Sequence, residues 1–173
     1  MIEAVRSVWL VGLSGSGKST TGPLVADRIG FDFVDLDAQI QRKTGETIPQ
    51  IFRTGGEPRF RRLEAAATSE IATLAGVVVA TGGGWMARSD VERVGEGRVR
   101  VWLRVSPEVA IHRLGDGVGS GRPLLDAPDP EAALTALYRA RKPAYAEAEL
   151  SVETDGRSPV EVAEEVVRRL EGC

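Results

Sequence analysis

Short, continuously apolar runs constrain the fold of this chain more than any other feature. The clearest are "VWLV" (8–11), "VVVA" (77–80) and "VRVWLRV" (99–105), with shorter runs at "FV" (33–34) and "LSVE" (150–153). Several are apolar at successive positions rather than at alternate ones, which is typical of parallel strands that are covered on both faces. We therefore predict five strands in a parallel sheet.

Helices are predicted between these strands. Three pairs, Ser106-Pro107, Asp129-Pro130 and Ser158-Pro159, place a capping side chain before a proline at the first helical position. A long amphipathic helix is indicated by apolar residues at three- and four-residue spacing, namely Phe60, Leu63, Ala67, Ile71 and Leu74. The alternation predicts one doubly wound α/β domain over residues 1–173, with helices on both faces of the sheet.

Composition narrows the possible partners and compartment. The chain has 173 residues, a net charge of −3 and a pI near 5.4, which argues against a general nucleic-acid binder. Its only cysteine is Cys173, so we expect neither disulfides nor a cysteine metal site, and a reducing cytoplasm fits. No run approaches the roughly 20 apolar residues that span a bilayer. We expect a cytoplasmic monomer that binds neither membrane nor nucleic acid.

The segment "GLSGSGKST", residues 12–20, follows the first strand and matches G-x-x-x-x-G-K-[ST]. Glycines let backbone N–H groups turn toward phosphate oxygens, and the start of the following helix adds positive charge. Lys18 is expected to reach the β- and γ-phosphates of a nucleotide, and Ser19 to ligate Mg²⁺. The remaining cradle residues are Gly15, Ser16, Gly17 and Thr20.

Two carboxylates, Asp35 and Asp37, follow the second strand and would share one face if the strand continued through both. One interpretation is only that aspartate begins turns and caps helices. Alternatively, both lie at the edge where the cradle is, provided that their strand neighbours the first. One would then serve the metal, and the other could accept the proton of an incoming hydroxyl.

A second glycine run, "TGGGW" (81–85), ends the third strand at the same edge. It is either a flexible turn or a place where a ligand approaches the backbone closely. An aspartate often stands at this strand end in phosphate-binding folds, and none does here. Metal binding must then depend on Ser19 and, through water, Asp35.

Arginines occur beside these segments. Arg61 could merely pair with Glu57 or Glu64 at helical spacing. Arg141 lies just before the helix-ending Pro143, and Arg113 and Arg122 flank a loop of alternating glycines. That alternation, followed by one arginine, predicts a mobile lid over about 113–125.

The chain resembles the shikimate kinases, which are small-molecule kinases of the P-loop fold, over nearly its whole length. The resemblance rests on the ordered motifs "GLSGSGKST", "DLD", "KTGETIPQIFRTGGEPRFRRLE", "TGGG", "RPLL" and "RKPAY". It implies an ATP- and Mg²⁺-dependent enzyme that phosphorylates the 3-hydroxyl of shikimate, a step toward chorismate and the aromatic amino acids.

The resemblance also implies individual roles. Lys18 and Arg122 would act on the transferring phosphate, Asp37 would bind substrate hydroxyls and act as base, and Asp35 would hold the metal through water. Helices over about 36–75 would bind the substrate. The shikimate carboxylate and ring would contact Arg61, Arg141, Gly82, Gly83 and Gly84, and the adenine would contact Arg113 and Arg157.

The residue types agree with such a substrate, because a small acid with three hydroxyls needs cations for its carboxylate and acceptors for its hydroxyls. Paired arginines suit a carboxylate because the guanidinium binds it in a bidentate manner. Two alternatives remain: a different small-molecule kinase, such as a gluconate or nucleoside-monophosphate kinase, and a nucleotide-dependent regulatory module. The identity of the acceptor decides between them.

Overall fold

The computed structural model describes residues 5–87, 97–115 and 122–172. Their centre is a parallel sheet of the five predicted strands, in the order β2-β3-β1-β4-β5. The strands are β1 (Ser7–Val11), β2 (Asp32–Asp35), β3 (Val77–Ala80), β4 (Arg98–Arg104) and β5 (Leu150–Glu153). All pairings are parallel, as the continuous apolar runs predicted.

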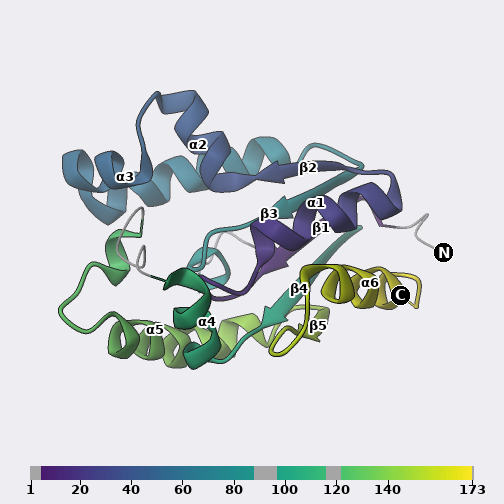
Figure 1. The fold of residues 1–173 in the computed structure, drawn as a ribbon. Coiled ribbons are helices and arrows are strands. Elements are labelled where there is room, and N and C mark those ends of the chain that lie inside the picture. Colours follow the sequence, from purple (N-terminus) through teal and green to yellow (C-terminus); the bar gives the residue numbers. More distant parts are fainter. Residues whose placement is uncertain (1–4, 88–96, 116–121, 173) are drawn as a thin grey trace.

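Six α-helices surround the sheet in the part of the chain that the structure describes (Figure 1). They are α1 (Lys18–Ile29), α2 (Leu36–Thr44), α3 (Ile48–Ile71), α4 (Pro107–Leu114), α5 (Pro130–Tyr145) and α6 (Pro159–Leu170). The caps Ser106, Asp129 and Ser158 each accept a hydrogen bond from the backbone three residues on. The three predicted helix starts are therefore confirmed.

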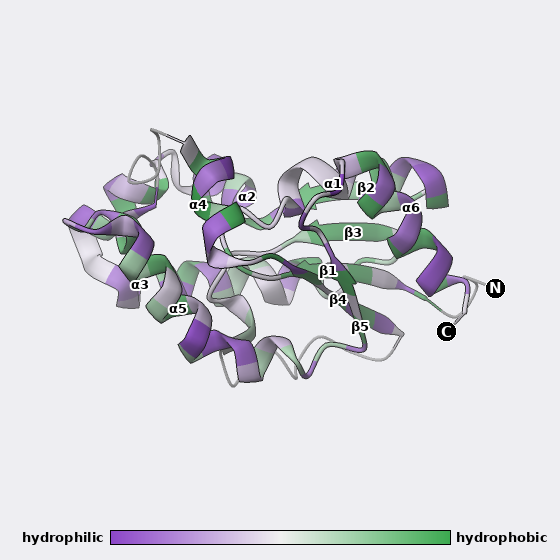
Figure 2. Ribbon diagram, turned by 60° about the horizontal axis from the view of Figure 1, so that its bottom comes forward, coloured by the Kyte–Doolittle hydropathy of each residue, from purple (hydrophilic) through white to green (hydrophobic). Residues whose placement is uncertain are grey.

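Alternate side chains of β1 divide the core into two layers. Val8 and Leu10 pack with helices α1 and α6, whereas Trp9 and Val11 pack with α2, α3 and the end of α5. Figure 2 shows the apolar strands enclosed by helices whose outer surfaces are largely polar. Both faces of the sheet are covered, which confirms the predicted doubly wound α/β fold.

Two sequence predictions within this fold were wrong. Helix α3 ends at Ile71, so Leu74 lies beyond it and is 47% exposed. The helix is also interrupted, because Gly56 has a non-helical backbone (φ 64°, ψ −173°). The second error concerns Pro143, which does not end a helix, because α5 continues through it to Tyr145. In addition, β3 lies between β2 and β1, so the condition that the strand before Asp35 neighbours the first strand is not met.

The carboxyl ends of parallel strands lie at one edge of the sheet, where ligands bind in open α/β folds. The segment 12–17 follows β1, Asp35 ends β2, the glycine run follows β3, and Thr154 follows β5. The topology thus gathers at this edge the phosphate loop, Asp35, the glycine run and the loop that carries Arg157. No helix among the described residues is both long and apolar enough to cross a membrane.

Candidate active site

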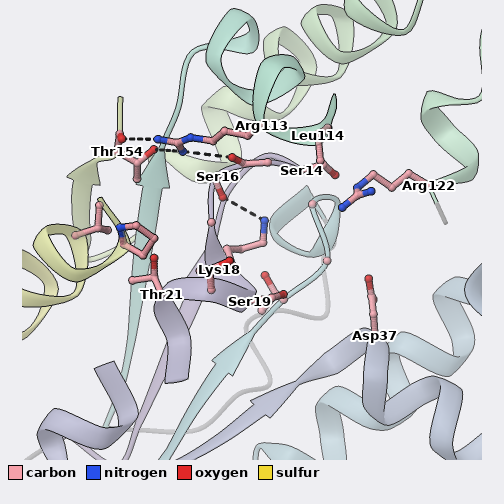
Figure 3. Close-up of a pocket in the computed structure, with 18 of the residues that line it drawn as sticks. Ser14, Ser16, Lys18, Ser19, Thr21, Asp37, Arg113, Leu114, Arg122 and Thr154 are labelled. Atoms are coloured by element: carbon pink, nitrogen blue, oxygen red, sulfur yellow. Dashed lines mark hydrogen bonds between the residues drawn. The ribbon is translucent and has the colours of Figure 1, made fainter. Parts of the chain in front are cut away.

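A cavity of about 480 Å³ opens at this edge of the sheet, and a smaller one of about 80 Å³ adjoins it. The larger cavity is lined by the segment 14–21, the smaller one by residues of α3 and α5. The two share the lining residues Ser14, Asp37, Gly82, Gly83 and Arg122. Figure 3 shows Lys18, Asp37 and Arg122 around the larger cavity, reaching it from three separate segments.

The loop before α1 has the backbone that a phosphate cradle requires. Gly15 and Gly17 have positive φ angles of 82° and 92°, which side chains rarely adopt. A methyl group on Gly15 would also lie only 2.7 Å from the carbonyl oxygen of Ala110. Glycine is therefore needed here for two reasons, and the loop leads directly into the positive end of α1.

Lys18 lies against this loop and is 8% exposed. Its ammonium group donates hydrogen bonds to the carbonyls of Gly12 (2.7 Å) and Leu13 (2.9 Å) and to Ser16 Oγ (3.3 Å). Burial lowers the pKa of Lys18 to about 8, although the nearby charges of Asp37 and Asp35 favour the protonated form. A phosphate group in the cavity would return Lys18 toward its ordinary pKa.

Asp35 makes two different hydrogen bonds. Its Oδ1 accepts one from the backbone N–H of Ala38, which caps α2, and its Oδ2 accepts one from Ser19 Oγ at 2.6 Å. The capping interpretation is confirmed for this residue, and its bond to Ser19 places it beside the phosphate loop. The prediction that Asp35 and Asp37 share a strand face was wrong, because β2 ends at Asp35 and Asp37 lies in the first turn of α2.

Ser19 and Asp35 suit Mg²⁺, because both offer oxygen atoms beside the phosphate loop. Among the described residues, no group of three or more His, Cys, Asp or Glu side chains could hold a metal. Mg²⁺ is usually held by one or two protein oxygens together with waters and substrate phosphates, so two ligands are sufficient. The residues present therefore fit this metal.

Asp37 is half-buried and lines both cavities, so it lies at their junction. Its Oδ1 has no hydrogen-bond partner in the described part of the chain. Desolvation raises the pKa of Asp37 to about 6, and the negative charges of Glu64 and Asp35 act in the same direction. A carboxyl group with this pKa and an unpaired oxygen can accept a proton near neutral pH.

The glycine run after β3 lies between the phosphate loop and two arginines. A methyl group on Gly83 would lie 3.4 Å from the backbone nitrogen of Ser14 and 3.3 Å from Nη1 of Arg141. On Gly84, it would lie 2.5 Å from Nη2 of Arg61. The run is not merely a flexible turn, since side chains there would meet the groups that line the smaller cavity.

Arg61 pairs with both carboxylates that the sequence suggested. It donates to Glu57 Oε1 (2.9 Å) and to Glu64 Oε2 (2.8 Å), and Glu64 is fully buried. These bonds do not remove Arg61 from the site, because its guanidinium still lines the smaller cavity with Arg141. The pairing interpretation is confirmed, and Arg61 remains available to a ligand of the smaller cavity.

Arg113 and Arg157 also line the larger cavity. Arg113 donates to the carbonyl oxygen of Thr154 (2.6 Å) and to its hydroxyl (3.0 Å), which joins α4 to the loop after β5 (Figure 3). Ser16 and Thr20 also line this cavity. Of the predicted lid, residues 116–121 lie outside the described residues, whereas Arg122 contributes to both cavities.

Sequence reasoning missed several lining or supporting residues. Ser14 borders both cavities, and Thr81 and Thr154 border the larger one. Glu64 was considered only as a partner of Arg61, yet its charge acts on Asp37. Tyr145 closes the motif "RKPAY" and donates a hydrogen bond to the carbonyl of Gly83. The motif itself was the signal that could have identified Tyr145.

The sequence is similar to those of known shikimate kinases. The family model described as shikimate kinase matches residues 14–171. A shikimate kinase of Parasynechococcus marenigrum is 42% identical over 95% of this chain and 86% of its own length. One of Pseudomonas entomophila is 44% identical, over 96% of this chain and 97% of its own length.

A solved structure extends the similarity to three dimensions. Shikimate kinase from Acinetobacter baumannii, in complex with shikimate, superposes with a TM-score of 0.93 and is 33% identical. The match covers 99% of this chain and 96% of that one. Since the family model and these relatives cover nearly the whole chain, this chain belongs to the shikimate kinase family and is a kinase.

Proposed function

We propose that this chain transfers the γ-phosphoryl group of ATP to the 3-hydroxyl of shikimate, with the roles given below for its residues. The observation that carries the assignment is the pair of adjoining cavities. One is lined by the phosphate loop, the other by two arginines, and Asp37 lies at their junction. A nucleotide and a small acid would thus meet at a carboxylate.

In the larger cavity, backbone N–H groups of Gly15, Ser16 and Gly17 bind the phosphates, with Lys18 and Thr20 beside them. Arg113 and Arg157 contact the adenine on the far side. Mg²⁺ is held by Ser19 directly and by Asp35 through water. When bound, the metal supplies positive charge that neutralises the phosphate oxygens.

In the smaller cavity, Arg61 and Arg141 bind the shikimate carboxylate, and Gly82, Gly83 and Gly84 let the ring approach the backbone. Asp37 orients the 3-hydroxyl and accepts its proton as the hydroxyl oxygen bonds to the γ-phosphorus. The bond from that phosphorus to the bridging oxygen breaks, and ADP leaves. Lys18 and Arg122 stabilise the charge on the transferring group, so both act in catalysis.

The assay that tests this function measures ADP release with shikimate, gluconate and AMP offered separately. We expect rapid release only with shikimate, together with a product that carries one phosphate on the 3-oxygen. Faster release with gluconate or AMP would overturn the assignment of the acceptor. Slow release that no acceptor accelerates would instead favour the regulatory module.

The remaining parts of the proposal concern the setting of the enzyme. The single cysteine at the end of the chain supports a reducing compartment, which we take to be the cytoplasm. We expect the enzyme to act as a monomer. Sedimentation of the purified protein would test the monomer.

A further inference from the structure

Tyr145 connects the substrate-facing glycine run to the helix that carries Arg141. It is the last residue of α5 and is 1% exposed. Its hydroxyl donates a hydrogen bond to the carbonyl oxygen of Gly83. Burial raises the pKa of Tyr145 to about 12, so the hydroxyl keeps its proton at neutral pH and remains a donor.

The same hydroxyl also interacts with Arg141, which lies one helical turn earlier on α5. The positive charge of Arg141 opposes the rise in the pKa of Tyr145, because the guanidinium lies near the hydroxyl. The proton of the hydroxyl goes to the carbonyl of Gly83. Tyr145 thus lies near an arginine of the site and is bonded to the backbone opposite it.

Gly83 occupies a narrow position between two parts of the site. A methyl group on its α-carbon would lie 3.3 Å from Nη1 of Arg141 on one side and 3.4 Å from Ser14 of the phosphate loop on the other. A shift of the glycine run would therefore change its distance from both. The hydrogen bond from Tyr145 is a specific restraint on that position.

We propose that Tyr145 is a positioning residue for the acceptor: its hydroxyl sets the distance between the Arg141 guanidinium and the backbone of Gly83, and so the width of the carboxylate site. The inference rests on the proposed role of Arg141 in binding the shikimate carboxylate. Tyr145 itself acts through Arg141 and Gly83, and it takes no part in the proton transfer.

A single substitution isolates the hydroxyl. The ring of Tyr145 packs against Trp102, with centroids 5.8 Å apart, and its side chain belongs to the buried core. Tyr145→Phe keeps this ring packing and removes only the oxygen. Tyr138→Phe is the matched control, because it removes a hydroxyl from a partly buried tyrosine of the same helix, where Lys142 lies over the ring.

The experiment measures kcat and both KM values for the wild type, Tyr145→Phe, Tyr138→Phe and Arg141→Ala. For Tyr145→Phe we expect the KM for shikimate to rise on the order of tenfold, since the buried carbonyl of Gly83 loses its hydrogen bond and the glycine run loses a restraint beside Arg141. The KM for ATP should stay at the wild-type value, and kcat should fall less than the shikimate KM rises. Tyr138→Phe should match the wild type.

A second readout separates positioning from stability. The preference for shikimate over its neutral amide should decrease in Tyr145→Phe, because a displaced Arg141 distinguishes the two less well. A wild-type KM and preference in Tyr145→Phe would overturn the proposal. So would an equal rise in both KM values with a lower melting temperature, which would indicate a merely structural residue.

The Arg141→Ala variant shows which assignment has failed. If it raises the KM for shikimate while Tyr145→Phe does not, only the role of Tyr145 is wrong. If Arg141→Ala leaves that KM unchanged, the carboxylate site itself is wrong, and the role of Tyr145 falls with it.

Discussion

Arg61 and Arg141 approach the same α-carbon from two different helices. A methyl group on Gly84 would lie 2.5 Å from Nη2 of Arg61 and 3.1 Å from Nη2 of Arg141. Two positive guanidinium groups repel each other, so an anion between them relieves an unfavourable contact. Arg61 is also bound by Glu57 and Glu64, which offset part of its charge. The arrangement suits a carboxylate better than a neutral sugar.

Replacement of either arginine by alanine should weaken shikimate binding by about 2–5 kcal/mol, because a desolvated charge loses its partner. The KM for ATP should not change. The preference for shikimate over its neutral amide should be strong in the wild type and much weaker in both variants. An unchanged preference would remove the reason for assigning a carboxylate to this cavity. Arg61→Ala should in addition lower the melting temperature, since it breaks an ion pair with the buried Glu64.

Asp37→Asn should reduce kcat strongly and leave ATP binding nearly unchanged, because the amide keeps the shape but cannot accept a proton. The variant should also be more stable than the wild type at pH 8. Folding raises the pKa of Asp37 from 3.8 to about 6, so the ionised carboxylate costs the folded state on the order of 3 kcal/mol above pH 6.

The sign of this effect is specific. A group whose pKa is higher in the folded state than in the unfolded state stabilises the fold fully at a pH below its pKa in the unfolded state. This stabilisation is lost as the pH rises through its pKa in the folded state. The advantage of Asp37→Asn should therefore disappear between pH 6 and pH 4. Urea unfolding at both ends of this range measures it. A variant that is less stable at pH 8 would contradict the burial of a charged Asp37.

The two functions of Asp35 can be separated by two substitutions. Asparagine is also a good helix cap, so Asp35→Asn should keep the bond to Ala38 and lose only negative charge beside Ser19. We expect a higher Mg²⁺ concentration for half-maximal activity and little change in melting temperature. Asp35→Ala should show the same metal defect together with about 1 kcal/mol of destabilisation. Titration with Mg²⁺ and thermal unfolding distinguish the variants, and an equal melting temperature for both would show that the cap contributes nothing.

The value of kcat/KM for ATP should depend on two groups of the free enzyme. Activity should rise through pH 6 as Asp37 loses its proton, and fall above pH 8 as Lys18 loses its own. The alkaline limb should move upward in the profile of kcat, because bound phosphates stabilise the charged lysine. Initial rates between pH 5 and pH 10 test this. An alkaline limb at the same pH in both profiles would show that Lys18 does not contact phosphate.

Lys18→Met should lower kcat on the order of 10²-fold or more, because the transferring phosphoryl group loses a fixed positive charge. The fold should persist, since the ammonium group bonds only to loop carbonyls and Ser16 Oγ. Circular dichroism serves as the control for folding. Near-normal turnover by a folded variant would contradict the phosphate cradle.

Local chemistry explains which features the sequence predicted. The five strands could be recognised because burial on both faces makes them continuously apolar. Three helix starts could be recognised because Ser or Asp before Pro is typical of an N-cap followed by the first helical residue. The order of the strands could not be recognised in this way, because β2 and β1 are separated by a strand that lies more than 40 residues later in the chain. The helical spacing of apolar residues also continues past Ile71, where α3 ends, so Leu74 was wrongly assigned to the helix.

The sequence predicted which residues form the candidate site better than it predicted the contacts between them. Motif positions identified Lys18, Asp37, Arg61 and Arg141, which the structure gathers around two adjoining cavities. The bond from Tyr145 to Gly83 joins residues that are distant in the chain, and no local pattern indicates it. The same holds for Glu64, whose effect on Asp37 depends on how α3 packs beside α2.

The two oxygens of Asp35 have a thermodynamic consequence. One binds the first turn of α2, which carries Asp37, and the other binds the serine that would ligate the metal. Any ligand that reorients this carboxylate therefore acts on the nucleotide half and the acceptor half of the protein together. Such linkage is reciprocal. If bound Mg²⁺·ATP changes the affinity for shikimate by some factor, then bound shikimate must change the affinity for Mg²⁺·ATP by the same factor.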